Sequence, residues 1–371
     1  MSHQETDRPF LLRPDNFTPL TRTPWAGTRI LSRYKPGLGP APAPVGESWE
    51  ISVEPDFPSR CEETGELLAA VLARSPTKLL GREATLGRTG TALLVKLLDA
   101  ADDLSVQIHP ADGDPQLGPD ESGKPEAWYI LERDAGAVIY LGLRDGVERS
   151  DVIRTIDTGA SLAPLLFPVP IEPGDFFVLH AGTAHAIGRG ACLVEPQSVE
   201  PGRRGVTYRY WDWNRRYDAS GALDPSGRPR PLHLDRALGV TRWQAPREAA
   251  LLDVARVRLG PAPKAAAQLE PLCGPGAPLG SDDLCVARLA GTGEVALPDA
   301  SVLRGLTVVG GHIELAGARY SVPVHAGWSA VLPACLHDVT ARLTNAHALL
   351  CSVADSSLDG ARPVGKIAAR P

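Results

Sequence analysis

Short segments in which apolar and polar residues alternate, separated by glycine and proline, make up most of the chain. A period of two is typical of strands with one buried face. We expect strands at residues 46–55, 104–109, 124–132 and 135–143. Two further strands around a tight turn are expected within 173–197, and helical spacing of apolar residues predicts short helices at 66–74 and 148–156.

The pattern changes near residue 245. Residues 259–283 are rich in proline, alanine and glycine and poor in aromatic residues, which is typical of a linker or loose loops. Residues 301–334 return to short alternating strands separated by glycine. We therefore predict a mainly β protein with two units, residues 1–245 and a smaller β-barrel at 246–371.

Composition narrows the class of protein. Of 371 residues, 43% are hydrophobic and 22% charged, which is ordinary for a globular chain. The formal net charge of −6 argues against a nucleic-acid partner, because phosphate binding needs a cationic face. The first residues show no secretory signal, no apolar run reaches a membrane span, and the six cysteines form no CxxC pair. We expect a cytoplasmic protein with no membrane partner.

Two pairs of polar residues with the same spacing stand out as candidate site residues. Gln107 and His109 are two positions apart at the end of one predicted strand, and Lys124 and Glu126 are two apart at the start of the next. Residues at i and i+2 of a strand share a face. A hairpin closed by residues 110–123 would bring both pairs to one barrel mouth.

Together with His185, which follows a turn, these residues offer an amide, two imidazoles and a carboxylate. Such a set suits a divalent cation, with zinc favoured by two neutral imidazoles and room left for substrate oxygens. Taken singly, His109 before a proline is more often a turn residue, and Glu126 a solvated charge. Their joint occurrence in consecutive β segments favours a site, and Arg209 is a further candidate.

Several motifs together resemble the type I mannose-6-phosphate isomerases, or phosphomannose isomerases, of the cupin superfamily. The motifs are "GESWEIS" (46–52), "LLVKLLDAADDLSVQIHP" (93–110), "GKPEAWYIL" (123–131), "PGDFFVLHAGTAHAIG" (173–188), "TYRYWDWNR" (207–215) and "PLHLDRAL" (231–238). The resemblance is to the short bacterial form and implies a cupin (jelly-roll) barrel. Residues 327–338 are similar to the turn at 173–185 but lack a histidine at the matching position, so we expect two cupin barrels with a few short helices, the second barrel degenerate and without metal. The resemblance implies a reversible interconversion of mannose 6-phosphate and fructose 6-phosphate through an enediol.

The resemblance also implies roles for individual residues. It implies one zinc ion per chain, and the implied ligands are Gln107, His109, Glu126 and His185. Arg209 matches the family's catalytic arginine, and Lys124 matches the lysine beside the glutamate ligand; both are expected to act in catalysis and to bind substrate. Trp49 and Ser105 fall on segments that line the family's substrate cleft. Burial beside zinc would lower the pKa of Lys124.

One departure from the family pattern leaves alternatives open. Four positions before the arginine the family usually carries an acidic residue, and here that position is Gly205, with Glu200 as a possible replacement. A metal-free cupin that only binds a sugar phosphate, or another cupin metalloenzyme acting on a sugar phosphate, remains an alternative. The expected partner is a small sugar phosphate, and the chain is expected to be a monomer or homodimer.

Overall fold

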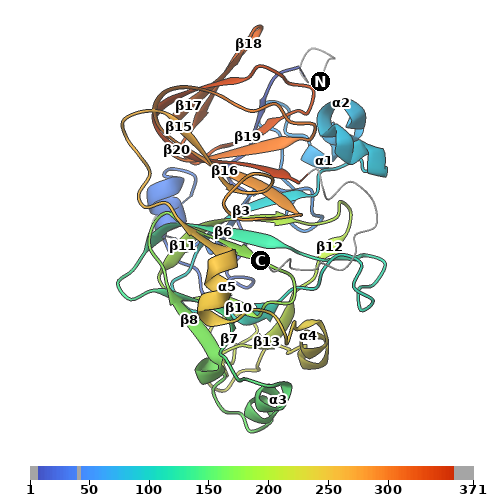
Figure 1. The fold of residues 1–371 in the computed structure, drawn as a ribbon, viewed down its shortest axis with the longest axis vertical. Coiled ribbons are helices and arrows are strands. Elements are labelled where there is room, and N and C mark those ends of the chain that lie inside the picture. Colours follow the sequence, from blue (N-terminus) through green and yellow to red (C-terminus); the bar gives the residue numbers. More distant parts are fainter. Residues whose placement is uncertain (1–6, 40–42, 355–371) are drawn as a thin grey trace.

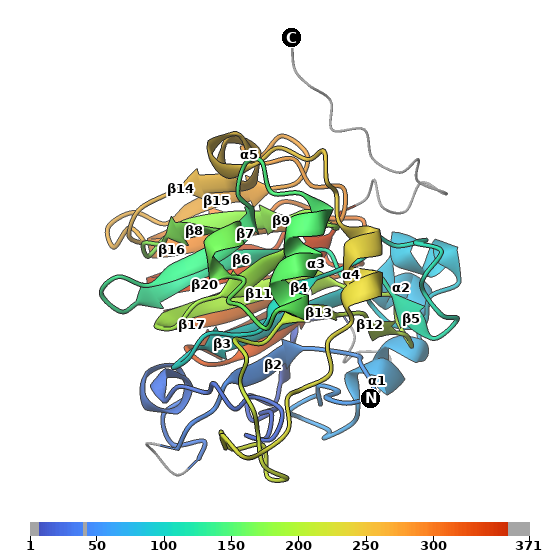
Figure 2. The same ribbon diagram turned by 90° about the horizontal axis from the view of Figure 1, so that it is seen from below.

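The computed structural model describes residues 7–39 and 43–354. Residues 1–6, on which the expected absence of a secretory signal partly rests, lie outside these ranges, as does the end of the predicted C-terminal unit. Three sheets, of five, six and seven strands, are stacked in that order (Figures 1 and 2). Helices cover the outer face of the five-stranded sheet.

The first barrel is formed by a five-stranded and a six-stranded sheet that face each other. In spatial order, the five-stranded sheet contains β13 (Tyr208–Trp211), β4 (Val106–Ile108), β10 (His185–Ile187), β7 (Val138–Leu143) and β8 (Leu166–Pro170). The six-stranded sheet contains β14 (Arg256–Arg258), β9 (Asp175–Leu179), β6 (Glu126–Arg133), β11 (Ala191–Ser198), β3 (Leu93–Asp99) and β2 (Glu47–Ile51). A small parallel pair joins β5 (Glu121–Ser122) to β12 (Arg204–Gly205).

The second unit is built on a seven-stranded sheet with long, bulged strands. Its order is β1 (Phe10–Leu12), β19 (Ser329–Leu332), β17 (Arg304–Gly317), β20 (Thr340–Val353), β16 (Leu284–Ala296) and β15 (Gln268–Cys273), and β18 (Tyr320–His325) also pairs with β17. The five α-helices of the described ranges are α1 (Leu68–Ala73), α2 (Pro76–Leu80), α3 (Arg149–Asp157), α4 (Leu234–Val240) and α5 (Glu248–Ala255). None of them is long and apolar enough to cross a bilayer.

Hydrophobic cores alternate with the sheets. One core fills the first barrel, and a second lies between the five-stranded sheet and helices α3 and α4. A third, larger core joins the outer face of the six-stranded sheet to the seven-stranded sheet, and a fourth fills the second unit. Strand β3 is buried along its whole length because apolar groups pack against both of its faces. This burial on both faces makes the six-stranded sheet a rigid support for the side chains it projects into the first barrel.

The predicted fold class, mainly β with a few short helices, is confirmed, and so are the predicted helices at 66–74 and 148–156. The interpretation of 259–283 as linker or loose loops is wrong in part, because β15 lies within it and pairs with β16. The division at residue 245 stays a prediction. Strands cross it in both directions, since β1 pairs with β19 and β14 pairs with β9.

Candidate active site

A row of three side-chain positions crosses the five-stranded sheet. In the register of the antiparallel strands, Gln107 on β4 lies directly opposite His185 on β10 and directly opposite Arg209 on β13. Opposite residues of neighbouring strands share one face of the sheet. His109 follows the end of β4, two positions after Gln107, and returns to the same side. Strand pairing therefore gathers four of the predicted residues along one line.

Glu126 reaches this line from the opposite sheet. It is the first residue of β6, in the six-stranded sheet, whereas β4 lies in the five-stranded sheet. The predicted hairpin closed by residues 110–123 is therefore wrong, because that segment forms β5 and crosses from one sheet to the other. The two pairs of polar residues still meet, across the inside of the barrel and not along a hairpin.

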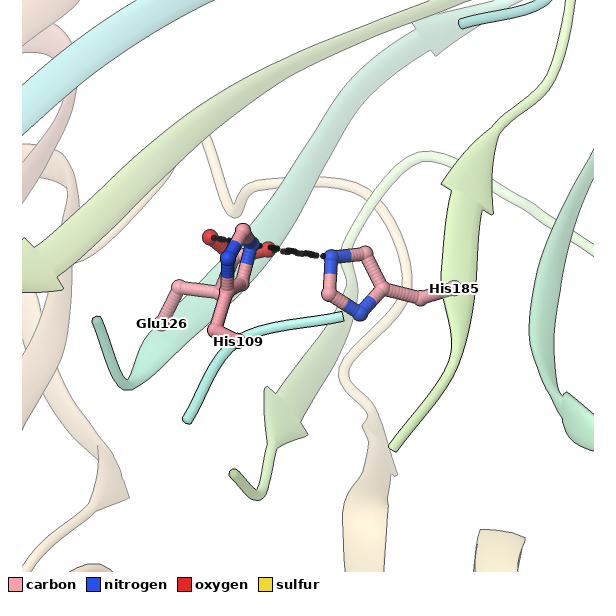
Figure 3. A group of neighbouring side chains, drawn as sticks. All are labelled: His109, Glu126 and His185. Carbon is pink, nitrogen blue, oxygen red and sulfur yellow. Dashed lines mark hydrogen bonds and ion pairs between the residues drawn. The ribbon is translucent and has the colours of Figure 1, made fainter. Parts of the chain in front are cut away.

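His109, Glu126 and His185 form one compact, buried group (Figure 3). The Nε2 atoms of the two histidines are 3.2 Å apart. Nε2 of His109 lies 3.2 Å from Oε2 of Glu126, and Nε2 of His185 lies 3.1 Å from its Oε1. Three side chains from three separate strands or strand ends thus point their polar atoms at one small volume.

The second ring nitrogen of each histidine shows which atoms face that volume. Nδ1 of His109 is 2.9 Å from the carbonyl of Val206, and Nδ1 of His185 is 2.8 Å from the carbonyl of Thr183. A carbonyl can only accept, so each Nδ1 carries the proton and donates it. Burial lowers the pKa of His109 to about 3, which keeps this ring neutral at physiological pH.

In the neutral form with Nδ1 protonated, each ring presents a lone pair at Nε2, and Glu126 presents a carboxylate. Lys124 and Gln197 donate to Glu126, and a cation between the three side chains would satisfy the two Nε2 lone pairs as well. Two neutral imidazoles and one carboxylate are the ligand types of catalytic zinc sites, and outer hydrogen bonds that fix the ring orientation are typical of such sites. The residues present therefore fit a divalent metal ion.

Gln107, the fourth predicted ligand, is half-buried with its backbone opposite that of His185, and its part as a ligand stays a prediction. Arg209 and Ser105 are in contact, since Nε of Arg209 donates to Oγ of Ser105 at 3.3 Å. Nη1 of Arg209 donates to the carbonyl of Pro231 at 2.9 Å. The structure thus holds the guanidinium group in one orientation, two strands away from His185.

Lys124 also lies in the buried group, with Nζ 3.4 Å from Oε2 of Glu126. Burial by itself would lower the pKa of Lys124, but the carboxylate of Glu126 outweighs burial and raises it. The expected lowering of this pKa beside zinc stays a prediction. In the same way burial would raise the pKa of Glu126, but its neighbours, the ammonium of Lys124 foremost, outweigh burial and hold it well below its usual range. The two groups hold each other charged.

Sequence reasoning missed a row of polar residues across the six-stranded sheet. Lys96 on β3 lies opposite Trp49 on β2 and opposite Glu195 on β11. Its Nζ is 4.2 Å from the centre of the Trp49 ring and 3.6 Å from Oε2 of Glu195. Nε1 of Trp128 donates to Oε1 of Glu195 at 2.9 Å. The signal was available, because Lys96 is the one charge inside an apolar run at 92–98.

The predicted substrate residue Trp49 is held by this row. Its ring is buried under Lys96, and its Nε1 donates to Oε2 of Glu47 at 2.9 Å. Burial and the nearby charge of Glu126 raise the pKa of Glu195, although Lys96 opposes this shift. The barrel interior therefore carries two buried lysines and two buried glutamates beside the histidines.

The departure at Gly205 has a local structural reason. A Cβ atom at Gly205 would lie 3.0 Å from Cδ of Lys124, so the absence of a side chain leaves room for that lysine. The backbone N–H of Gly205 donates to Oε1 of the buried Glu54 at 3.3 Å. Glu200 pairs with Arg88. Glu54, and not Glu200, is thus the carboxylate in contact with the position where the family carries an acid.

Comparison with known proteins supports the resemblance. Residues 27–134 match the family model described as "Phosphomannose isomerase type I, catalytic domain". A mannose-6-phosphate isomerase of Streptococcus mutans serotype c is 32% identical over 219 residues, which are 58% of this chain and 63% of that relative. The match spans less than two thirds of the relative. The resemblance to type I phosphomannose isomerases is confirmed.

The fold is shared along nearly the whole chain. The crystal structure of the mannose 6-phosphate isomerase from Bacillus subtilis has a TM-score of 0.70 with 24% identity, and the match covers 93% of this chain and 99% of that one. A structure of a mannose 6-phosphate isomerase bound with zinc and yttrium has a TM-score of 0.63 with 15% identity, covering 93% and 99%. This chain therefore shares the fold of these structures along nearly its whole described length.

Proposed function

We propose that this chain is a metal-dependent aldose-ketose isomerase that interconverts mannose 6-phosphate and fructose 6-phosphate. The observation that carries the proposal is the convergence of His109, Glu126 and His185, three buried acceptors whose polar atoms lie within 4.8 Å of one another. A metal-free binding module would have no reason to keep these acceptors together against their mutual repulsion. We infer the substrate, mannose 6-phosphate, from the resemblance to the phosphomannose isomerases.

The metal that these residues would hold is zinc, one ion per chain, with Gln107 as the fourth ligand. Two neutral imidazoles and a carboxylate favour zinc over harder cations, which prefer oxygen ligands alone. When bound, the ion would act as a Lewis acid that polarises sugar oxygens and orients the substrate.

The chemical task is to move one proton from C2 of the aldose to C1, while the hydroxyl hydrogen of O2 is lost and O1 gains one. Charge collects on O1 and O2 as the enediol forms. Arg209 and Lys124, both positively charged, stabilise that charge or hold the phosphate through charge-assisted hydrogen bonds. Ser105 and the carbonyl of Pro231 orient the Arg209 guanidinium for this role.

Trp49 and Lys96 support the substrate side of the cavity. The ring of Trp49 is fixed by Glu47 and by the ammonium of Lys96, so it holds Lys96 in place at the substrate side of the barrel. Lys124 lies 3.4 Å from Oε2 of Glu126 and is placed either to hold the phosphate or to take part in proton transfer, and no base is assigned.

The test is metal analysis of the purified protein together with a coupled assay for fructose 6-phosphate. We expect zinc in a ratio near one per chain, turnover of mannose 6-phosphate, and loss of turnover on chelation that zinc restores. Binding of the sugar phosphate without turnover in zinc-loaded protein would instead establish a binding module. Turnover of a different sugar phosphate only would establish another cupin enzyme.

Three variants separate metal binding from catalysis. His185→Ala should lose both zinc and turnover, whereas Arg209→Ala and Lys124→Met should keep zinc and lose turnover. The matched controls are His337→Ala, Arg319→Ala and Lys264→Met. These three residues are exposed and lie within residues 246–371, outside the candidate site. Normal turnover in Arg209→Ala would contradict the assigned role of the arginine.

The remaining expectations on organisation belong to the same proposal. We infer a cytoplasmic enzyme that works as a monomer or homodimer, with the site in residues 1–245 and a supporting unit at 246–371. None of the six cysteines forms a disulfide, which is consistent with a reducing compartment. Light scattering of the zinc-loaded protein determines the oligomeric state.

A further inference from the structure

A second pair of histidines lies far from the site described above. His312 on β17 and His325 at the end of β18 are directly opposite each other in register. Their strands form a hairpin at the end of the molecule that is remote from the first barrel (Figure 1). His325 is exposed and His312 is half-buried, so both rings are accessible to solvent.

The two rings are placed as a chelating pair. Their Nδ1 atoms are 3.2 Å apart, and the ring centres are 4.6 Å apart. Two bonds of about 2.05 Å from one cation to two imidazoles, at angles between square and tetrahedral, place the nitrogens about 2.9–3.4 Å apart. The same separation of 3.2 Å joins the Nε2 atoms of His109 and His185 in the candidate active site.

The local backbone is arranged around this pair. The register between β17 and β20 shifts between Gly310 and His312, which marks a bulge directly before the histidine. Gly311 has φ +66°, and a Cβ there would lie 2.1 Å from the carbonyl oxygen of Asn345, so only glycine fits. Bulges re-aim the side chains that follow them. A bulge that requires glycine therefore lies directly before His312, the residue that pairs with His325 on β18.

One carboxylate, that of Glu314, lies on the same face of β17 as His312. Glu314 lies two positions after His312 on β17 and therefore on the same face. Its carboxylate accepts hydrogen bonds from Ser321 and from Arg342. Two imidazoles leave the remaining coordination positions to solvent, which makes a bound ion exchangeable.

We propose that His312 and His325 form a second, solvent-exposed site for a divalent transition-metal ion of the copper, nickel and zinc group. Imidazole selects these ions over magnesium and calcium, and the order of affinity is copper above nickel and zinc. A bound ion joins β17 to β18 and stabilises the folded hairpin by an amount that grows with the logarithm of the free metal concentration above Kd. The site is independent of the proposed isomerase activity.

The experiment is a titration of the zinc-loaded protein with nickel, in which isothermal titration calorimetry measures the binding. The wild-type protein should bind one nickel ion in addition to its resident metal. His312→Ala and His325→Ala should each weaken this binding at least tenfold and leave sugar-phosphate turnover unchanged. His337→Ala is the matched control, because His337 is an exposed single imidazole beside Asp299, and it should bind nickel as the wild type does.

Several results would overturn the proposal. Equal nickel affinity in the wild type and in both hairpin variants would show non-specific surface binding only. An effect of one variant without the other would show that the rings do not act as a pair. Because the two substitutions lie on different strands, circular dichroism of each variant checks that the hairpin still folds, and His325→Gln offers a second, milder change on β18.

Discussion

Replacing Gln197 with leucine tests whether a buried amide holds Glu126, the carboxylate of the proposed metal site, in place. Gln197 lies on β11 directly opposite Glu126, and its Nε2 donates to Oε2 of Glu126 at 2.8 Å. The side chain is fully buried, and its Oε1 has no hydrogen-bond partner among the described residues. The amide thus orients Glu126 through one strong contact while one of its own atoms stays unsatisfied.

The structure predicts a loss of metal affinity with little change in stability. A hydrogen bond to a charged group is worth about 1.5–3 kcal/mol, and loss of a group that supports a metal ligand lowers metal affinity by about 10–100-fold. The unsatisfied Oε1 costs about 1–3 kcal/mol in the folded state, and leucine removes that cost. Gln197→Leu should therefore bind zinc about ten to a hundred times more weakly, with almost unchanged unfolding free energy in the metal-free form.

The assay is competition for zinc with a chromophoric chelator, together with urea unfolding of the metal-free protein. Gln268→Leu is the matched control, because Gln268 is exposed on β15 and should change neither quantity. Zinc affinity equal to that of the wild type would refute the assigned role of Gln197. A parallel loss of affinity and stability would show that leucine disrupts the barrel as a whole.

Three further predictions concern stability. Burial lowers the pKa of His347 to about 4. Because the unfolded chain binds more protons at this residue, its contribution to the unfolding free energy falls by about 2 kcal/mol from pH 7 to pH 5. Urea unfolding of His347→Gln should therefore show a smaller loss of stability over this pH range than the wild type. Asp212→Asn removes the buried carboxylate that pairs with Arg230 at 2.6 Å, so the unfolding free energy in urea should drop by about 3 kcal/mol. Gly81→Ala places a Cβ 2.0 Å from a backbone oxygen and should lower the melting temperature in calorimetry by several degrees more than Gly87→Ala, which also has positive φ but open space.

Local alternation predicted most elements of the first barrel but not how they pair. Residues 104–109 and 124–132 do contain strands, β4 and β6, because their apolar residues recur with a period of two. The pairing was wrong, because β4 bonds to β10 and β13 while β6 bonds to β9 and β11. Strand partners far apart in the chain depend on contacts that no short segment encodes.

Some residues of the candidate site could likewise be predicted from the sequence, and others could not. Spacing alone grouped His109 with Glu126, and the structure brings them within 3.2 Å. Lys96 and Glu195 went unnoticed because each is a single charge in an apolar strand, and nothing local shows that they lie opposite each other. A charge at the centre of a strand that is buried on both faces needs a partner. That rule identifies Lys96 as a polar site residue, although it cannot name Glu195 as the partner.

The charges of the barrel interior explain why a cation and an anionic substrate suit the same cavity. The buried charges of Lys96, Lys124, Glu126 and Glu195 cancel formally, and the half-buried Glu47, which accepts from Nε1 of Trp49, adds one negative charge. In the proposed enzyme a divalent ion and Arg209 would then leave the interior with a net positive charge. In the proposed enzyme a phosphomonoester, with a charge of about −1.5 to −2, would offset this positive charge. The charged reaction intermediate would bind more tightly than the substrate only if Arg209 and Lys124 approach the sugar oxygens more closely in that state, so the position of their donors decides the rate.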